Sequence, residues 1–260
     1  MKLKFLTVFI LLGFNPLALT ACAKPTAESV IVSQNAEEIY KNGEKYYLGK
    51  GVSQNYQKAF QLIEQAANMG LADAQNDLAS MYFDGLGTKQ DYEKAFFWFS
   101  KSAQQNFPEA QYNLGLMYAN GNSVPVSKTK ALELYTKAAE QNFPQAQFNL
   151  ANAYLNGDGL PRDESKALEL YTKAAEQNFP QAQFNLANAY FNGDRLPKDQ
   201  KKAVELYTKA AEQNFPQAQF NLAYIYEHNF NDREKAKYWF KKASDNGIEQ
   251  AGEALMRLDD

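Results

Sequence analysis

The chain has 260 residues, of which 45% are hydrophobic and 14% aromatic, enough to bury a substantial core and too many for a disordered protein. Its formal net charge is −3 and it has no basic stripe to neutralise phosphates, which argues against a nucleic-acid-binding protein. Its single cysteine, Cys22, excludes an intramolecular disulfide.

The first residues have the pattern of a secretory signal. Lys2 and Lys4 precede an apolar run over residues 5–12, which is too short to span a membrane comfortably. The sequence LTAC follows at residues 19–22 and resembles the bacterial lipoprotein box, in which the cysteine is acylated and becomes the new N-terminus. We therefore expect a signal peptide over residues 1–21 and lipidation of Cys22.

A lipid on Cys22 would hold the protein at a membrane surface by burying its acyl chains. Ala23 follows the cysteine, and by resemblance to Gram-negative lipoproteins this residue is compatible with sorting to the periplasmic face of the outer membrane. Residues 22–34 contain few structure-forming signals and are expected to form a flexible tether. The alternative is ordinary cleavage after Ala23, since residues 21–23 also fit the A-x-A pattern, and this would release a soluble secreted protein.

The rest of the chain repeats with a period of 36 residues. The segment FPQAQFNLANAY occurs at residues 143–154 and again at residues 179–190. A fixed period of this length is the signature of a repeat protein. The predicted repeats cover residues 35–70, 71–106, 107–142, 143–178, 179–214 and a shortened 215–247, followed by a half repeat over residues 248–260.

Each repeat carries signals for two helices, as residues 143–178 illustrate. Pro144 suits a first helical turn, and Gly157 is expected to end that helix. The apolar residues between them share one helical face, at Ala146, Leu150, Ala151 and Tyr154. Asp163 is expected to cap a second helix. The second helix carries its own apolar face at Ala167, Leu170, Tyr171, Ala174 and Ala175.

The position at the end of each second helix holds only glycine or asparagine. These are the residues that best tolerate the left-handed backbone conformation of a helix C-terminus. The six residues are Gly70, Asn106, Asn142, Asn178, Asn214 and Gly247. Their agreement supports the register of the predicted repeats.

Three motifs resemble those of Sel-1-like repeats, which are related to tetratricopeptide repeats. They are AQYNLG at residues 110–115, the loop Gly85-Leu86-Gly87 and the pair Lys94-Ala95 that follows this loop. The resemblance covers residues 35–260. It implies an all-α fold, a right-handed α-solenoid of about six helix-turn-helix repeats with a concave groove, stabilised by stacking of each repeat on its neighbours.

Motifs of catalysis and metal binding are missing from the sequence, including HExxH, CxxC, the G-x-S-x-G elbow and the P-loop. With Cys22 acylated no Cys–His pair is available, and we expect His228 to be a solvated loop residue. Exposed carboxylates such as Glu133 recur with lysines on the same helix, which is typical of a solvated face. The sequence therefore predicts a non-enzymatic protein with no cofactor and no metal.

Asparagines recur at two first-helix positions that lie off the apolar face. An asparagine amide can donate to and accept from a peptide backbone at once. In tetratricopeptide domains asparagines at similar positions hold extended peptides, and this resemblance makes them candidate contacts for a protein or extended peptide. They are Asn113, Asn149, Asn185 and Asn221 at one position, with Asn152 and Asn188 three residues on. The alternative is that they are exposed polar residues copied by duplication.

Residues 131–154 match residues 167–190 at every position, including Gln145, Asn149 and Glu176, which we expect to face water. Two explanations remain open: recent duplication, or a regular ligand such as an extended peptide or glycan. We favour recent duplication, with the groove retained as a binding surface.

These observations predict a non-enzymatic lipoprotein of the cell envelope that binds another protein, as a scaffold or adaptor. Some bacterial Sel-1-like lipoproteins are immunity proteins that neutralise secreted lipase toxins in the periplasm, and this resemblance supplies an alternative. A further alternative, from another class, is a cell-wall or β-lactam hydrolase, for which the sequence offers no nucleophile constellation.

Overall fold

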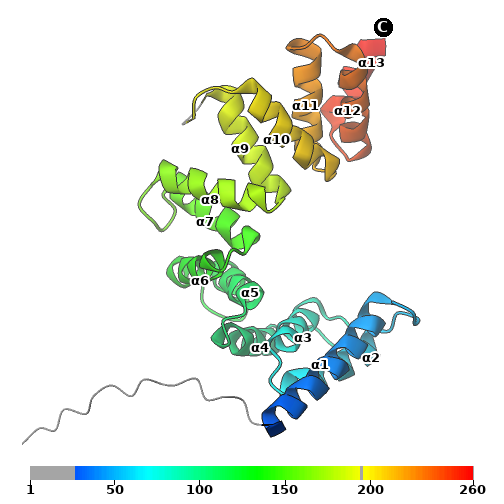
Figure 1. Cartoon of the computed structure of the whole chain (residues 1–260), viewed down its shortest axis with the longest axis vertical. Helices are drawn as coiled ribbons and strands as arrows, with labels where there is room; N and C mark the ends of the chain where they lie inside the picture. Colours follow the sequence, from blue (N-terminus) through cyan, green and yellow to red (C-terminus); the bar gives the residue numbers. More distant parts are fainter. Residues whose placement is uncertain (1–26, 194–195, 260) are drawn as a thin grey trace, which may run out of the picture.

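The computed structural model describes residues 27–193 and 196–259, and this part of the chain forms thirteen helices and no strand. They are α1 (Ala27–Leu48), α2 (Tyr56–Asn68), α3 (Ala72–Asp84), α4 (Tyr92–Gln104), α5 (Pro108–Asn120), α6 (Lys128–Glu140), α7 (Pro144–Asn156), α8 (Glu164–Glu176), α9 (Pro180–Asn192), α10 (Gln200–Glu212), α11 (Pro216–His228), α12 (Arg233–Asp245) and α13 (Glu249–Asp259). Odd-numbered helices open each repeat and even-numbered helices close it. The pairs follow one another along an open arc (Figure 1). The predicted all-α solenoid is confirmed.

Each helix packs mainly on its neighbours in sequence. The first helix of a repeat contacts the second helix of the same repeat, which in turn contacts the first helix of the next. Alanines let the helices approach closely, and Ala146 and Ala151 of α7 and Ala174 of α8 are fully buried. Because the core is a series of such contacts, each repeat is stabilised chiefly by its neighbours.

The helix ends form as the sequence predicts. Pro144 occupies the first turn of α7, and Gly157 ends it in the left-handed conformation with φ 69°. The Asp163 side chain caps α8 by accepting a hydrogen bond from the Lys166 backbone N–H at 3.0 Å. At the predicted position after α8, Asn178 is left-handed with φ 62°.

Two expectations are corrected. Residues 27–34, assigned to the tether, belong to α1, which begins at Ala27. His228 is the last residue of α11 instead of a loop residue, and its exposed ring stacks on Tyr224 with the ring centroids 4.0 Å apart. The predicted signal peptide over residues 1–21 and the lipidation site Cys22 lie outside the described residues.

The two ends of the solenoid differ from its middle. In α1, Glu38 and Asn42 are exposed at the positions where α3 buries Ala74 and Leu78. A polar outer face is what a terminal repeat needs, because no further repeat covers it. At the other end α13 has no second helix within the described residues, and Met256 of α13 is 75% exposed.

Candidate binding surface on the first helices

A ladder of buried glutamines joins successive repeats. Gln183 of α9 is 0% exposed, and its Nε2 donates to the Ala175 carbonyl of α8 at 3.2 Å. Its Oε1 accepts a hydrogen bond from Gln213 Nε2, just after α10, at 2.9 Å. One amide therefore ties α9 to the helix before it and to the helix after it. The same pairing recurs as Gln75–Gln105, Gln111–Gln141, Gln147–Gln177 and, with an asparagine as donor, Gln219–Asn246.

The sequence interpretation missed this ladder, although a signal was present. Gln147 directly follows buried Ala146 and lies four residues before buried Ala151. Residues four apart share a helical face, so the position of Gln147 is on the core side. A polar residue that repeats there indicates a satisfied buried hydrogen bond.

The predicted asparagines are half-buried and make contacts inside the protein. The Tyr171 hydroxyl donates to Asn152 Oδ1, and the Tyr207 hydroxyl donates to Asn188 Oδ1 in the next repeat. Asn221 Nδ2 donates to Asn188 Oδ1 at 3.4 Å. These bonds give a third reason for repeating the asparagines, since they satisfy tyrosine hydroxyls that the core otherwise buries.

The other two asparagines with hydrogen bonds extend this pattern toward the N-terminus. Asn149 Nδ2 donates to the Tyr112 hydroxyl at 3.5 Å, and Asn113 Nδ2 donates to Asn76 Oδ1 at 3.2 Å. Burial raises the pKa of the neighbouring Tyr135 to about 12, so its hydroxyl stays protonated at neutral pH. Asn185 lines a recess, described below, together with Asn152 and Asn188.

Together with their neighbours one helical turn away, these asparagines form a continuous surface that we call the first-helix strip. It comprises the residues at spacing i, i+4, i+7 and i+11 on the first helices of five repeats, α3, α5, α7, α9 and α11, which lie on one helical face. The strip consists of Asp73, Asp77, Ser80 and Asp84 on α3; Glu109, Asn113, Leu116 and Asn120 on α5; Gln145, Asn149, Asn152 and Asn156 on α7; Gln181, Asn185, Asn188 and Asn192 on α9; and Gln217, Asn221, Tyr224 and His228 on α11.

Four recesses occur along this strip, one at each step from α3 to α11. The recess between α3 and α5 has a volume of ≈ 170 Å³ and contains Asp84 and Asn113. The next three have volumes of ≈ 320, 330 and 320 Å³. Asn149, Asn185 and Asn221 line one each, beside Tyr135, Tyr171 and Tyr207 respectively. The strip is therefore hollowed at the repeat period, with an amide in each recess, tyrosines in the last three and phenylalanines in the first.

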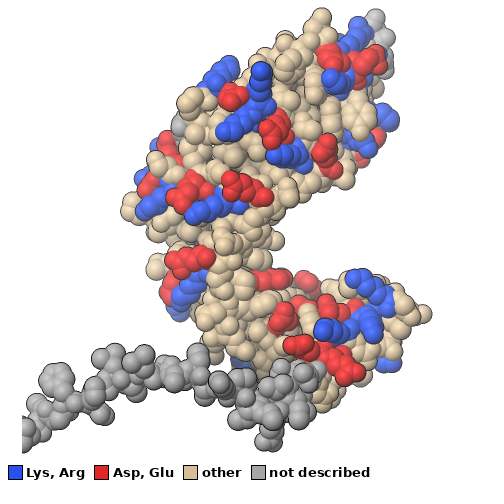
Figure 2. All heavy atoms as spheres, in the orientation of Figure 1, with Lys and Arg blue, Asp and Glu red and all other residues tan. Residues whose placement is uncertain are grey.

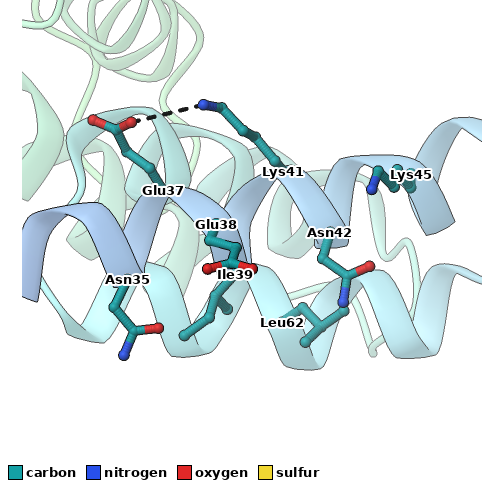
Figure 3. A pocket seen from close by; sticks show the side chains of 8 residues that line it. All are labelled: Asn35, Glu37, Glu38, Ile39, Lys41, Asn42, Lys45 and Leu62. Carbon is teal, nitrogen blue, oxygen red and sulfur yellow. Dashed lines mark ion pairs between the residues drawn. The ribbon is translucent and has the colours of Figure 1, made fainter.

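A larger recess, of ≈ 750 Å³, lies at the N-terminal end of the solenoid. Its lining is mostly polar and comes mainly from α1, with Leu62 from α2. Figure 3 shows Asn35, Ile39 and Asn42 on one side of α1, with the Glu37–Lys41 ion pair on the other. This recess belongs to the exposed end face and not to the repeated surface, so we do not include it in the candidate site.

Charge is unevenly distributed along the strip. Three of its four residues on α3 are carboxylates, whereas its residues on α7 and α9 are all amides. Within the described residues, Asp73, Asp84 and Glu109 form no ion pair, and all three side chains are exposed. Figure 2 shows acidic side chains on the lower arm of the arc, with lysines or arginines nearer its tip, and an uncharged stretch at the bend of the arc.

Asp77 is an aspartate at the position that holds asparagine in the four later repeats. It aligns with Asn113, and its carboxylate accepts a hydrogen bond from the Tyr40 hydroxyl at 2.7 Å. Burial raises the pKa of Asp77 to about 6, and the charges of Glu109 and Glu44 add to the rise, against the hydrogen bond from Tyr40. The negative charge of Asp77 is therefore disfavoured by its surroundings at the acidic end of the strip.

Two other kinds of site are absent from the part of the chain that the structure describes. The described residues contain no cluster of three or more histidine, cysteine or acidic residues placed to hold a metal ion. Among the helices of this part, none combines the length and apolarity needed to cross a bilayer.

The family profile described as Sel1 repeat matches six times, over residues 40–71, 72–107, 108–143, 144–179, 180–215 and 216–248. No curated protein matches the chain. Among solved structures, the chain is similar to a Sel1 repeat protein from Oxalobacter formigenes, with 31% identity and a TM-score of 0.77. The match covers 87% of this chain and 68% of that one.

Two further structures share the fold at lower identity. One is an immunity protein from Pseudomonas aeruginosa, with 21% identity, a TM-score of 0.54 and coverage of 89% of this chain and 90% of that one. A second immunity protein from Pseudomonas aeruginosa has 18% identity, a TM-score of 0.52 and coverage of 86% and 84%. At these identities the similarity concerns the fold alone.

Proposed function

The chain belongs to the Sel1 repeat family, a scaffold suited to protein–protein interaction, and we propose that it binds another protein through the first-helix strip, without enzymatic activity. The observation that carries this proposal is the set of four recesses at the repeat period, each lined by strip residues. The spacing of the recesses follows from the repeated sequence. It lets a partner that crosses several repeats place one group in each recess.

The chemistry of the recesses suits a polypeptide. Amides donate and accept hydrogen bonds at once, as a peptide backbone does. Asn156 and Asn192 are exposed at the recess edges, so their amides can reach a partner. Aromatic side chains line all four recesses and supply apolar contact for partner side chains, as in binding surfaces generally.

The proposal includes attachment to the cell envelope through a lipid on Cys22. It rests on the basic residues, apolar run and LTAC sequence before that cysteine. Metabolic labelling with a clickable fatty acid tests it, with Cys22→Ser as the control. Label on the wild type and none on the variant is expected, and an unlabelled wild type would refute the anchor and favour the secreted form.

A second candidate specifies the partner as a secreted toxin of the lipase type, with this chain as its periplasmic immunity protein. Support for this candidate comes from the export signal and from the solenoid fold shared with the two Pseudomonas immunity proteins. Inhibition of a purified lipase toxin by the chain, in proportion to complex formed, is the expected result. Unimpaired lipase activity at saturating chain would exclude this role and leave the scaffold or adaptor role.

Affinity capture from a native envelope extract tests the binding surface. The strip variant carries Asn156→Arg and Asn192→Arg, which fill two recess edges with large charged side chains. The matched control carries Gln61→Arg and Gln104→Arg, at exposed positions on α2 and α4. A partner captured by the wild type and the control but lost from the strip variant supports the proposal. A partner captured equally by all three would refute the assignment to the strip.

A further inference from the structure

We propose that the partner segment is extended and basic at one end, with its basic side chains over α3 and α5 and its uncharged side chains over α7 and α9; this rests on the proposed function. The strip changes character along its length, from carboxylates to amides. Such a surface fixes both the composition of a ligand and the direction in which it runs, since in the reverse orientation the basic side chains would lie over amides and the carboxylates would lose their partners.

Favourable interaction with the helix dipole explains only some of the carboxylates at the acidic end of the strip. Asp73 and Glu109 lie in the first turns of α3 and α5, where a negative charge is favourable to the helix dipole. Asp84, however, is the last residue of α3, where the dipole disfavours a carboxylate. Its side chain lines the first recess of the strip, so its placement is explained by a ligand group and not by the helix.

Asp77 gives a second argument from the buried part of the same face. The equivalent position is an uncharged asparagine in the four later repeats, so the repeat itself does not require a carboxylate there. The carboxylate is held near Glu44 and Glu109 at the cost of mutual repulsion. A cation on this surface would relieve that repulsion.

Basic residues of the chain itself do not neutralise this end. On α1, Lys41 occupies the position equivalent to Asp77, and it forms an ion pair with Glu37 at 3.7 Å. On α4, Lys94 is paired with its own cap residue, Asp91, also at 3.7 Å. Asp73, Asp84 and Glu109 are therefore available to the basic side chains of a partner.

Selection from a random peptide library displayed on phage tests the inference with the full chain as bait. Peptides of about 20 residues reach roughly 66 Å when extended, enough to cross several repeats. The test variant carries Asp73→Asn, Asp84→Asn and Glu109→Gln. The matched control carries Glu133→Gln, Glu169→Gln and Glu205→Gln, which remove the same charge from exposed positions on the second helices.

The wild type and the control are expected to enrich peptides with lysine or arginine gathered toward one end. Their affinity should fall about tenfold or more on the test variant and weaken with added salt. Circular dichroism checks that all three proteins are equally folded. The inference is overturned if no peptide is enriched, if the enriched peptides lack basic residues, or if they bind the test variant as well as the wild type.

The outcomes also separate this inference from the proposed function. Neutral peptides that bind the wild type but are lost from the Asn156→Arg and Asn192→Arg variant would keep the strip as a protein-binding surface and refute only the charge selection. Binding of neutral oligosaccharides on a glycan array, with no peptide enriched, would refute both and assign the strip to carbohydrate.

Discussion

Replacing Gln183 by methionine tests the amide ladder that joins the repeats. Methionine has a similar length and fills the space, so the cavity term is small. The change removes the bond from Gln183 Nε2 to the Ala175 carbonyl at 3.2 Å, the bond from Gln213 Nε2 at 2.9 Å and a long bond to Asn178 Oδ1 at 3.5 Å. The Ala175 carbonyl keeps its bond from the Asn178 backbone N–H at 3.0 Å, so no buried carbonyl is left unsatisfied.

The magnitude follows mainly from the two shorter bonds. A neutral intramolecular hydrogen bond contributes about 1 kcal/mol net, and burial of the more apolar methionine offsets part of the loss. We expect Gln183→Met to lower the free energy of unfolding by about 1–2 kcal/mol. Urea denaturation followed by circular dichroism measures it as a lower transition midpoint with an unchanged slope.

Gln217→Met is the matched control, because Gln217 is exposed on α11 and makes none of these bonds. Its effect should lie within about 0.5 kcal/mol of zero. Equal stability of wild type and Gln183→Met, or a more stable variant, would show that the buried amides do not hold the repeats together.

Three further variants test other parts of the structure. Gly87→Ala should destabilise far more than Gly51→Ala in urea titrations: both glycines have positive φ, but a Cβ on Gly87 would lie 2.1 Å from the Tyr56 carbonyl oxygen, and comparable losses would contradict the close approach. Asp77→Asn should stabilise increasingly between pH 4 and 7. Burial raises the pKa of Asp77 in the folded state to about 6, so folding favours the protonated carboxyl. Asp77 therefore stabilises the fold below its ordinary pKa of 3.8, and this stabilisation is lost as the pH rises through about 6. A pH-independent difference between the two proteins would refute this. Asn188→Ala should cost about 1–2 kcal/mol and much less in a Tyr207→Phe background, since the lost partner is then absent; an additive double-mutant cycle would argue against that bond.

Local features of the fold were predictable because they depend on residues close in sequence. Pro144, Gly157 and Asp163 act within one helical turn, and the structure places each where its chemistry requires. The 36-residue period then extends one repeat to the whole solenoid. Residues 27–34 were missed because they carry no apolar periodicity, yet they continue the first helix.

The candidate surface was predicted only in part. Sequence spacing finds the asparagines, but it cannot show that Asn152 and Asn188 accept hydrogen bonds from buried tyrosines 19 residues further along the chain. That contact depends on how two helices cross, which pattern analysis does not supply. The sequence interpretation missed the carboxylates of α3 for a simpler reason. It identified this position by its repeated asparagine, and the residue there in α3 is Asp77.

Photo-crosslinking in intact cells tests the central claim most directly. Asn156, at a recess edge, is replaced by benzoyl-phenylalanine, and the comparison protein carries the same group in place of exposed Gln61 on α2. We predict that irradiation joins one defined partner protein to the chain from position 156 and not from position 61. Adducts from position 61 alone, or none from position 156, would contradict the assignment of partner binding to the first-helix strip.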